Sequence, residues 1–304
     1  MANMNVDHES LAPTNLRSDE ECSRIASPIG SGFRYACLPI PEAERRAVTA
    51  LRAFDLTLME ITDTRADTQI ARRKLDWWRN ALHQSCTHHT AEHPILQSLL
   101  AAVDRPTLND LVPYFEARLG AAVVELDYQG FEMQSDLEAY LDASGGAMYR
   151  LYARVLQAPQ DTHAELGQLG ALHHRLFRLT YLGRHVQRGQ IYLPAEQLTR
   201  SGLTEADFHR PNAPERLAVF LQAELSDIEN KQTEAITRLR VITPKPSTFF
   251  RAMIALDRAQ MALLRRHEAQ VLTSRPETTP FTRLVSAWWG SKRPLPKIRT
   301  SSST

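Results

Sequence analysis

Residues 41–63 read PEAERRAVTALRAFDLTLMEITD, and this stretch decides the fold class. Pro41 stands where a helix would begin, and the acidic Glu42 and Glu44 suit the positive end of a helix dipole. Apolar side chains then recur every three or four residues, on one face of a helix, at Ala47, Leu51, Phe54 and Leu58. The stretch therefore predicts a long amphipathic helix with one buried face.

The same spacing recurs along most of the chain. Further helical stripes of apolar residues are predicted within residues 70–82, 108–119, 217–236 and 249–263. Prolines separate these stripes, and only 12 glycines occur in 304 residues, which disfavours a turn-rich β fold. We therefore predict an all-α, single-domain helical bundle over residues 28–290. The polar residues 1–27 and the basic, serine-rich residues 291–304 are expected to be disordered.

Composition and charge exclude several classes of protein. The net charge of +1 gives no reason to expect a nucleic acid as partner. The sequence contains no run of about 18 apolar residues that would span a membrane, and its polar N-terminal segment resembles neither a signal peptide nor a transit peptide. Three cysteines without recognisable spacing suit a reducing compartment. We expect a cytoplasmic protein, peripheral to a membrane at most.

Five short segments, in this order and spacing, resemble the squalene/phytoene synthase superfamily. They are FRYA (33–36), ALRAF (50–54), LDWWR (75–79), LEAY (137–140) and RGQIYLP (188–194). The resemblance extends from about Phe33 to Trp289. It implies an isoprenoid-synthase-type helical bundle around an apolar cavity. It also implies enzymes that join two prenyl diphosphates head to head, with Mg²⁺ held between two aspartate-rich helix segments.

The resemblance also assigns roles to particular positions. The end of the site that would hold the diphosphate corresponds to Arg45, Arg184, Arg188 and Tyr192. The cavity wall corresponds to Phe33, Phe54 and Tyr140. The remaining candidates for Mg²⁺, as a weak or relic site, are Glu60 and Asp63. These two acids are three residues apart on one helix face and could share an ion, but two such acids equally suit a solvated helix surface.

The sequence departs from the family pattern at both metal-binding segments. Met59 replaces the first aspartate of the first segment, and His185 stands where the second segment begins with aspartate. The stretch between Arg184 and Gly189 is shorter than in the family, so a further aspartate is missing. In its loss of these aspartates, the chain resembles the branch of the superfamily that includes the mitochondrial complex I assembly factor related to phytoene synthase. Because Mg²⁺ needs hard oxygen ligands, ordinary condensation is expected to be impaired.

Three hypotheses about function remain open. The first is a catalytically impaired family member that acts as an isoprenoid-binding or assembly-type protein. The alternative is an active head-to-head prenyltransferase with unusual metal ligation, and the third is a soluble isoprenoid carrier. The expected ligand is a prenyl diphosphate or another isoprenoid. A membrane surface or a protein is a further candidate partner, because one tryptophan of each pair at 77–78 and 288–289 is expected to be exposed.

Overall fold

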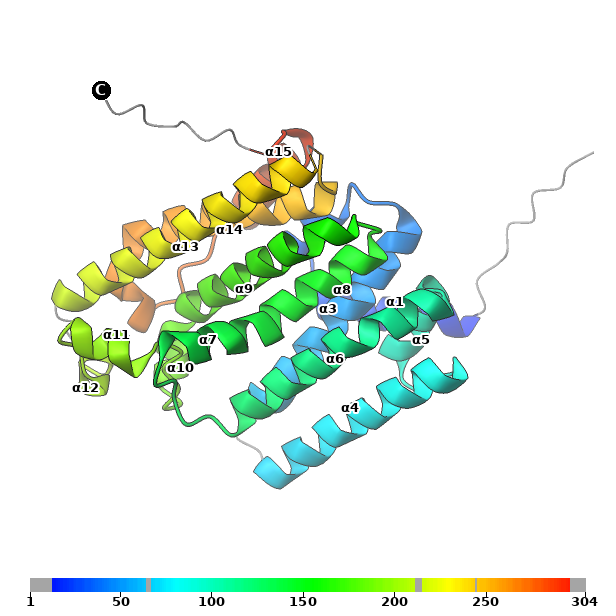
Figure 1. The fold of residues 1–304 in the computed structure, drawn as a ribbon, viewed down its shortest axis with the longest axis horizontal. Coiled ribbons are helices and arrows are strands. Elements are labelled where there is room, and N and C mark those ends of the chain that lie inside the picture. Colours follow the sequence, from blue (N-terminus) through cyan, green and yellow to red (C-terminus); the bar gives the residue numbers. More distant parts are fainter. Residues whose placement is uncertain (1–12, 64–66, 211–214, 244, 296–304) are drawn as a thin grey trace, which may run out of the picture.

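The computed structural model describes residues 13–63, 67–210, 215–243 and 245–295. Over these ranges the chain forms helices, and extended backbone pairs only at one bridge between Phe131 and Pro194 (Figure 1). The all-α prediction is confirmed. The α-helices are α1 Pro13–Ala26, α2 Gly32–Cys37, α3 Glu42–Asp63, α4 Thr68–His88, α5 Pro94–Ala102, α6 Arg105–Leu126, α7 Gln134–Leu141, α8 Ala147–Val155, α9 His163–Thr180, α10 Leu182–Val186, α11 Ala195–Arg200, α12 Glu205–Phe208, α13 Glu215–Ile242, α14 Thr248–His267 and α15 Pro280–Lys292. A π-helical turn, η1 (Asp142–Gly146), joins α7 to α8, and the short 3₁₀ turns are η2 (Gln160–Thr162) and η3 (Glu268–Leu272).

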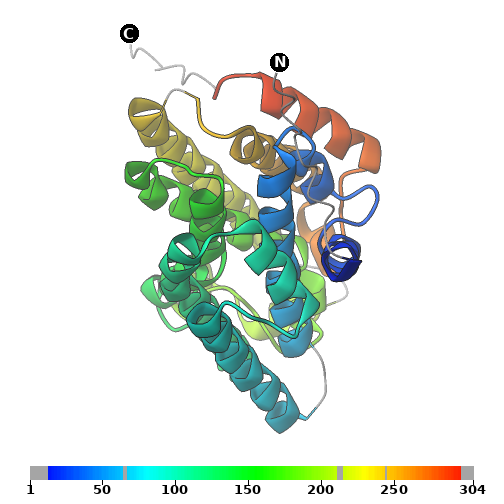
Figure 2. The same ribbon diagram turned by 90° about the vertical axis from the view of Figure 1, so that its right-hand side faces the viewer.

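The long helices form two layers. Helices α4, α6, α8, α9 and α13 follow one another as neighbours across the first layer (Figure 1). Helices α1, α3, α5, α14 and α15 lie in the second, as the view from the side shows (Figure 2). Helix α3 packs against both α6 and α8, and α14 packs against α9. The functional side chains described below lie where α3, α6 and α9 meet.

Helix α3 follows the predicted pattern closely. Its predicted stripe is buried throughout. Phe54 packs edge-to-face against both Trp78 and Phe115, with ring centroids 5.3 and 5.2 Å apart. Burial of one such aromatic side chain stabilises the fold by roughly 1.5–3 kcal/mol. The four other predicted stripes lie within α4, α6, α13 and α14.

The predicted disorder at the two ends is wrong for the described residues. Residues 13–26 form α1, where the buried Cys22 packs in the core and Asp19 pairs with Arg46 at 2.8 Å and accepts a hydrogen bond from Ser98 at 2.6 Å. At the other end α15 continues to Lys292 and Leu295 is buried. Tertiary contacts therefore order both segments. The remaining parts of the two predictions, residues 1–12 and 296–304, lie outside the described residues.

A helix that crosses a bilayer must meet requirements of length and of apolar character. A spanning helix needs about 20 predominantly apolar residues. None of the helices described above is both long enough and apolar enough to meet that requirement.

Candidate functional site

The end of α3 meets the segment that follows α9, as the resemblance implied. Asp63, at the last residue of α3, forms ion pairs with both Arg184 and Arg188, one to each carboxylate oxygen. Asp63 and Arg184 line a pocket of about 230 Å³, which we call the mouth pocket, and Arg188 is joined to it through its ion pair with Asp63. Its lining also includes Met59, Glu60, Thr62, Glu125, Phe177, Arg178, Tyr181, His185, Gln190 and Tyr192. The structure therefore brings Glu60 and Asp63 together with Arg184, Arg188 and Tyr192.

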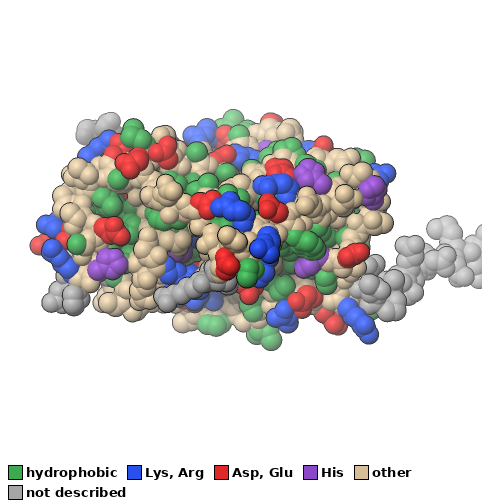
Figure 3. Space-filling model, turned by 90° about the horizontal axis from the view of Figure 1, so that it is seen from below, with side chains coloured by type: hydrophobic (Ala, Val, Ile, Leu, Met, Phe, Trp, Pro, Cys, Tyr) green, Lys and Arg blue, Asp and Glu red, His purple; other side chains and the backbone are tan. Residues whose placement is uncertain are grey.

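Basic and acidic side chains are interspersed around this end of the molecule. Figure 3 shows the side of the molecule that lies lowest in Figure 1, where α4 runs, and neither sign of charge dominates it. Glu60 is exposed, whereas Asp63 is about one-third exposed between its two arginines. The surroundings of Asp63 are therefore those of an ion-paired carboxylate.

Behind the mouth pocket lies a buried acid that the sequence did not reveal. Glu125, on α6, pairs with Arg178 at 2.9 Å and accepts hydrogen bonds from Thr62 at 2.8 Å and Tyr140 at 3.0 Å. Burial alone would raise the pKa of the Glu125 carboxyl, but the charges of Arg178 and Arg118 and these hydrogen bonds lower it to about 2. Glu125 is therefore a carboxylate that is already fully engaged by cations.

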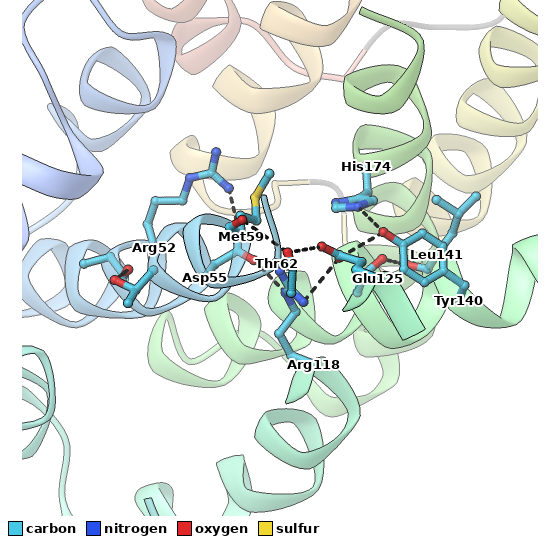
Figure 4. Close-up of polar contacts among 12 residues, drawn as sticks. Arg52, Asp55, Met59, Thr62, Arg118, Glu125, Tyr140, Leu141 and His174 are labelled. Carbon is cyan, nitrogen blue, oxygen red and sulfur yellow. Dashed lines mark hydrogen bonds and ion pairs between the residues drawn. The ribbon is translucent and has the colours of Figure 1, made fainter. Parts of the chain in front are cut away.

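The buried charges continue along the inner face of α3 (Figure 4). Arg118 is completely buried and lies 2.7 Å from Asp55 and 3.5 Å from Glu125. Arg52 pairs with the other oxygen of Asp55, at 2.7 Å. Together with Arg178 these residues place three cations against two carboxylates. The buried network thus carries an excess positive charge, which favours an anionic ligand over a metal cation.

His185 occupies the position where the family pattern has an acid. The side chain is buried, lines the mouth pocket, and both of its ring nitrogens lack a hydrogen-bond partner. Burial, with the nearby charge of Arg178, lowers the pKa of His185 to about 3. The imidazole is neutral at pH 7, so one nitrogen can donate and the other can accept. Buried polar groups are normally satisfied, so this side chain is suited to a ligand or a bound water.

The residues present do not fit Mg²⁺. This ion takes oxygen ligands in near-octahedral geometry, whereas Asp63 is held by two arginines and Glu125 by further cations. His185 is a neutral nitrogen donor, which suits softer metals. Over the described parts of the chain, no group of three or more Asp, Glu, His or Cys side chains is arranged to hold a metal ion. Of the two residues predicted as ligands, Asp63 is thus engaged by arginines, whereas Glu60 is exposed to solvent.

The structure separates Arg45 from the other predicted anion-binding residues. Arg45 lies near the start of α3 and lines a different pocket, with Arg34 and Arg46. Asp63 lies 18 residues further along the same helix, or roughly 27 Å at 1.5 Å per residue. The prediction that Arg45 shares a site with Arg184, Arg188 and Tyr192 is therefore wrong, because a continuous helix holds them apart.

The predicted cavity residues have three different environments. Phe33 lines a central cavity of about 230 Å³ beside the mouth pocket. Phe54 is packed in the core between Trp78 and Phe115, outside the lining of that cavity. Tyr140 is buried in the charge network, where its hydroxyl donates to Glu125. Only Phe33 among the three therefore lines the cavity.

The central cavity adjoins the mouth pocket, and Phe177 and Tyr181 line both. Its wall is only partly apolar, because charged pairs accompany the aromatic and aliphatic side chains. The best defined pair joins His173 Nδ1 to Asp257 Oδ1 at 2.7 Å, and the unpartnered hydroxyl of Tyr149 lies in the same wall. A carboxylate that orients an imidazole is an arrangement suited to hydrogen bonding or proton transfer.

The sequence offered little sign of these buried polar groups. Asp257 and Glu125 occur within helices of mixed composition, where an acid usually faces solvent. His173 and His174 are adjacent, so they point to different sides of α9. His173 faces Asp257, whereas His174 lies in the charge network beside Tyr140. Only the packing of α6, α9 and α14 places these groups at the pockets.

Comparisons with known proteins agree with this architecture. A model of the squalene/phytoene synthase family matches residues 28–282. Complex I assembly factor 6 of Rattus norvegicus is 26% identical over 59% of this chain, a match that spans about half (54%) of that relative. The 15-cis-phytoene synthase of Synechococcus elongatus is 23% identical over 88% of this chain and 90% of its own length. A dehydrosqualene synthase crystallised with a ligand shares the fold, with a TM-score of 0.78 at 18% identity over 91% of this chain and 96% of that chain. With a family match over most of its length, the chain belongs to the squalene/phytoene synthase family.

Proposed function

We propose that this protein binds one isoprenoid ligand with an anionic head group and does not condense two prenyl diphosphates. In this proposal it is a catalytically impaired family member that acts as an isoprenoid-binding or assembly-type protein. The observation that carries the proposal is the pairing of Asp63 with Arg184 and Arg188, because the acid expected to hold a metal is instead shared by two arginines, whose combined charge exceeds its own. The site thereby becomes suited to an anion without a bridging metal ion.

The size of the pockets supports a single ligand. The central cavity and the mouth pocket each have a volume of about 230 Å³. Sites that enclose a drug-sized ligand usually measure about 300–1,000 Å³. The two adjoining spaces could take one chain and its head group, whereas two prenyl chains would require the helices to move apart.

The arginines and the neutral imidazole give the proposed head-group site its chemistry. Arg184 and Arg188 can reorient from Asp63 towards a phosphate, which offers more oxygen acceptors than one carboxylate. Arg178 is held by its ion pair with Glu125 and contributes a positive potential from the buried side of the site. His185 can donate one further hydrogen bond in its neutral form. These residues bind and orient a ligand, and none of them requires a metal ion to do so.

The alternative is an active head-to-head prenyltransferase with unusual metal ligation. Similarity to the 15-cis-phytoene synthase over most of the chain favours it. Similarity to the complex I assembly factor favours an assembly-type role, although that match covers less of both proteins. The charge of the mouth pocket favours the binding protein over the active enzyme. Metal-assisted departure of diphosphate needs free carboxylates, whereas Asp63 and Glu125 are paired with arginines and only Glu60 is exposed.

Equilibrium binding of radiolabelled farnesyl diphosphate tests the proposal. We expect saturable binding in EDTA and an affinity that changes by less than about threefold when Mg²⁺ is added, since no metal site contributes free energy. The double variant R184Q/R188Q should bind at least about tenfold more weakly, because a hydrogen bond to a charged group contributes roughly 1.5–3 kcal/mol. Arg200→Gln, at an exposed pair with Glu196 on α11, is the control and should bind normally. Binding that requires Mg²⁺ would favour the alternative.

A further inference from the structure

Helix α15 lies at the outer edge of the molecule, packed on α14 and α2 (Figure 2). One side of it is pressed against α14, because a Cβ added at Gly290 would lie 2.5 Å from Ala255 Cβ. The opposite side carries Phe281, Leu284 and Trp288, all exposed, at the spacing of one helix face. Large apolar side chains that share one exposed face mark an interaction surface rather than scattered surface residues.

A loop from the other end of the chain extends this apolar surface. Ile29 is 92% exposed, the highest value among the large hydrophobic side chains that the structure describes. The next residue, Gly30, lies against Pro280, and its carbonyl accepts a hydrogen bond from Arg283 at 3.4 Å. Ile29 is thereby held beside the first turn of α15. We call Ile29, Phe281, Leu284 and Trp288 the α15 patch.

A basic groove borders the α15 patch. It lies between α14 and α15, has a volume of about 600 Å³, and contains no acidic side chain in its described lining. Arg251, Arg258 and Arg293 line it together with Trp289. The guanidinium of Arg293 lies 4.3 Å from the centre of the Trp289 ring, and the buried Nε of Arg251 has no hydrogen-bond partner. Three arginines without a carboxylate form a site that favours an anion.

We propose that the α15 patch and the basic groove dock this protein on an anionic phospholipid surface. Helices that lie in a membrane interface combine exposed Trp, Phe and Leu on one side with Lys or Arg beside them, and tryptophan is enriched at the headgroup level. Here the apolar stripe ends at Lys292, on the same helix face as Trp288. The apolar side chains enter the headgroup boundary, and the arginines of the groove bind lipid phosphates.

Charge complementarity favours a lipid surface over a protein partner. Each basic residue close to an anionic membrane strengthens binding, and the described lining of the groove presents three arginines and no acid. α15 itself contains no acidic residue either. A protein partner that neutralised this groove would need a dense acidic cluster beside an apolar strip, whereas an anionic bilayer presents both along its whole surface.

The position of the patch also relates it to the central cavity. Arg283, whose guanidinium donates to the carbonyl of Gly30 next to Ile29, lines that cavity together with Glu277 and Thr278. Docking through α15 would therefore place this wall of the cavity next to the bilayer. Entry of an isoprenoid ligand from the bilayer by this route rests on the proposed function. Docking itself requires only the α15 patch and the basic groove.

Vesicle co-sedimentation tests the docking surface independently of any ligand. The full-length protein should bind vesicles of phosphatidylcholine with 30% phosphatidylglycerol at least about tenfold more tightly than vesicles of phosphatidylcholine alone. Binding should weaken as salt rises, because surface charges are screened over about 8 Å at physiological ionic strength. F281S/W288S should lose most binding by removal of apolar contacts, and K292E/R293E should lose the preference for phosphatidylglycerol.

Trp77→Ser provides the matched control. Trp77, on α4, is about as exposed as Trp288 and belongs to a helix that does not pack against α15. This variant should bind vesicles like the unaltered protein. Equal binding by F281S/W288S and the unaltered protein, with folding verified by circular dichroism, would overturn the proposal. The proposal would also be overturned if the unaltered protein did not bind vesicles but formed a dimer, and F281S/W288S abolished that dimer. The patch would then bind a second copy of the chain.

Discussion

One carboxylate and two arginines set the charge around Asp63 at the mouth pocket. Asp63 is shared between Arg184 and Arg188, and His185 behind them is neutral. A carboxylate cannot bind a divalent cation strongly while two guanidinium groups occupy its oxygens. At the residue scale, the site therefore has the character of an anion-binding pocket that is closed by an internal carboxylate.

Replacement of Asp63 tests this character. Asp63→Asn should raise the affinity for inorganic diphosphate in EDTA at least about fivefold, because both arginines lose their internal partner. Stability should change by less than about 1 kcal/mol, since these pairs are partly exposed and screened by solvent. Isothermal titration calorimetry measures the affinity. If Asp63 is instead a metal ligand, the same variant will weaken diphosphate binding and will do so only when Mg²⁺ is present.

Acid should destabilise the fold through His185. Its pKa is about 3 in the folded chain and about 6.5 when unfolded. Between these values the unfolded chain binds the proton and the folded chain does not, so stability falls as the pH decreases. The loss approaches about 1.4 kcal/mol per pH unit below pH 6.5. His174, whose pKa is also lowered by burial, acts in the same direction.

His185→Gln isolates this contribution. The unfolding free energy of the unaltered protein should decrease between pH 7 and pH 5, and the variant should lose about 1–2 kcal/mol less over the same interval. Urea denaturation at each pH gives both values. Parallel pH profiles for the two proteins would show that His185 is solvated or protonated in the folded state.

Close contact between helices positions the histidines of α9. A Cβ added at Gly170 would lie 2.2 Å from the carbonyl oxygen of Gly145, and one added at Gly145 would lie 2.2 Å from the carbonyl oxygen of Gly170. Only glycine at both positions lets α9 lie directly on η1 and the start of α8. At the scale of elements, this contact places His173 and His174 at the cavity and the charge network.

Gly170→Ala should therefore destabilise the protein. Overpacking of a close contact costs about 1–3 kcal/mol, and here the obstacles are backbone atoms and the ring of Tyr149. Gly120→Ala, in the middle of α6 where an added Cβ meets nothing within 4 Å, is the matched control. It should stabilise the protein by about 0.5–1 kcal/mol. Denaturant unfolding distinguishes the two, and a neutral Gly170→Ala would mean that the helices are not in contact.

The helices themselves could be predicted because their apolar spacing is a local property. Residues 41–63 carry the whole signal for α3 within one stretch. Helix α1 could not be predicted in this way, since its polar residues Ser18 and Asp19 are satisfied by partners more than 75 residues away or on α3. Long-range pairing stabilises a segment whose composition alone resembles a disordered terminus.

The site was predictable only in part, for a related reason. The motif order indicated that Asp63 and Arg184 would meet, although it did not indicate that they would neutralise each other. Arg118 and Glu125 were missed, because a charged residue within a helix gives no sign of whether that helix face is buried. Arg45 was misplaced because the resemblance assigned its role without regard to the 18 residues of predicted helix between it and Asp63.

On the scale of the whole molecule, the family fold is retained, and we propose that it serves ligand binding rather than condensation. The buried network from Arg52 to Arg178 runs between the central cavity and the mouth pocket, and its excess charge is positive. Departure of diphosphate assisted by Mg²⁺ needs carboxylates that are free to hold the ion. We therefore expect ligand binding to persist without condensation.

The most direct test is incubation with labelled farnesyl and geranylgeranyl diphosphates and Mg²⁺, followed by product analysis. The 15-cis-phytoene synthase of Synechococcus elongatus serves as the active control in the same assay. Our account predicts no squalene, phytoene or cyclopropyl intermediate from this protein. It predicts none from Met59→Asp either, because the arginines on Asp63 and the neutral His185 remain. Formation of such a product at an ordinary enzymatic rate, about 1 s⁻¹ or faster, would contradict the account.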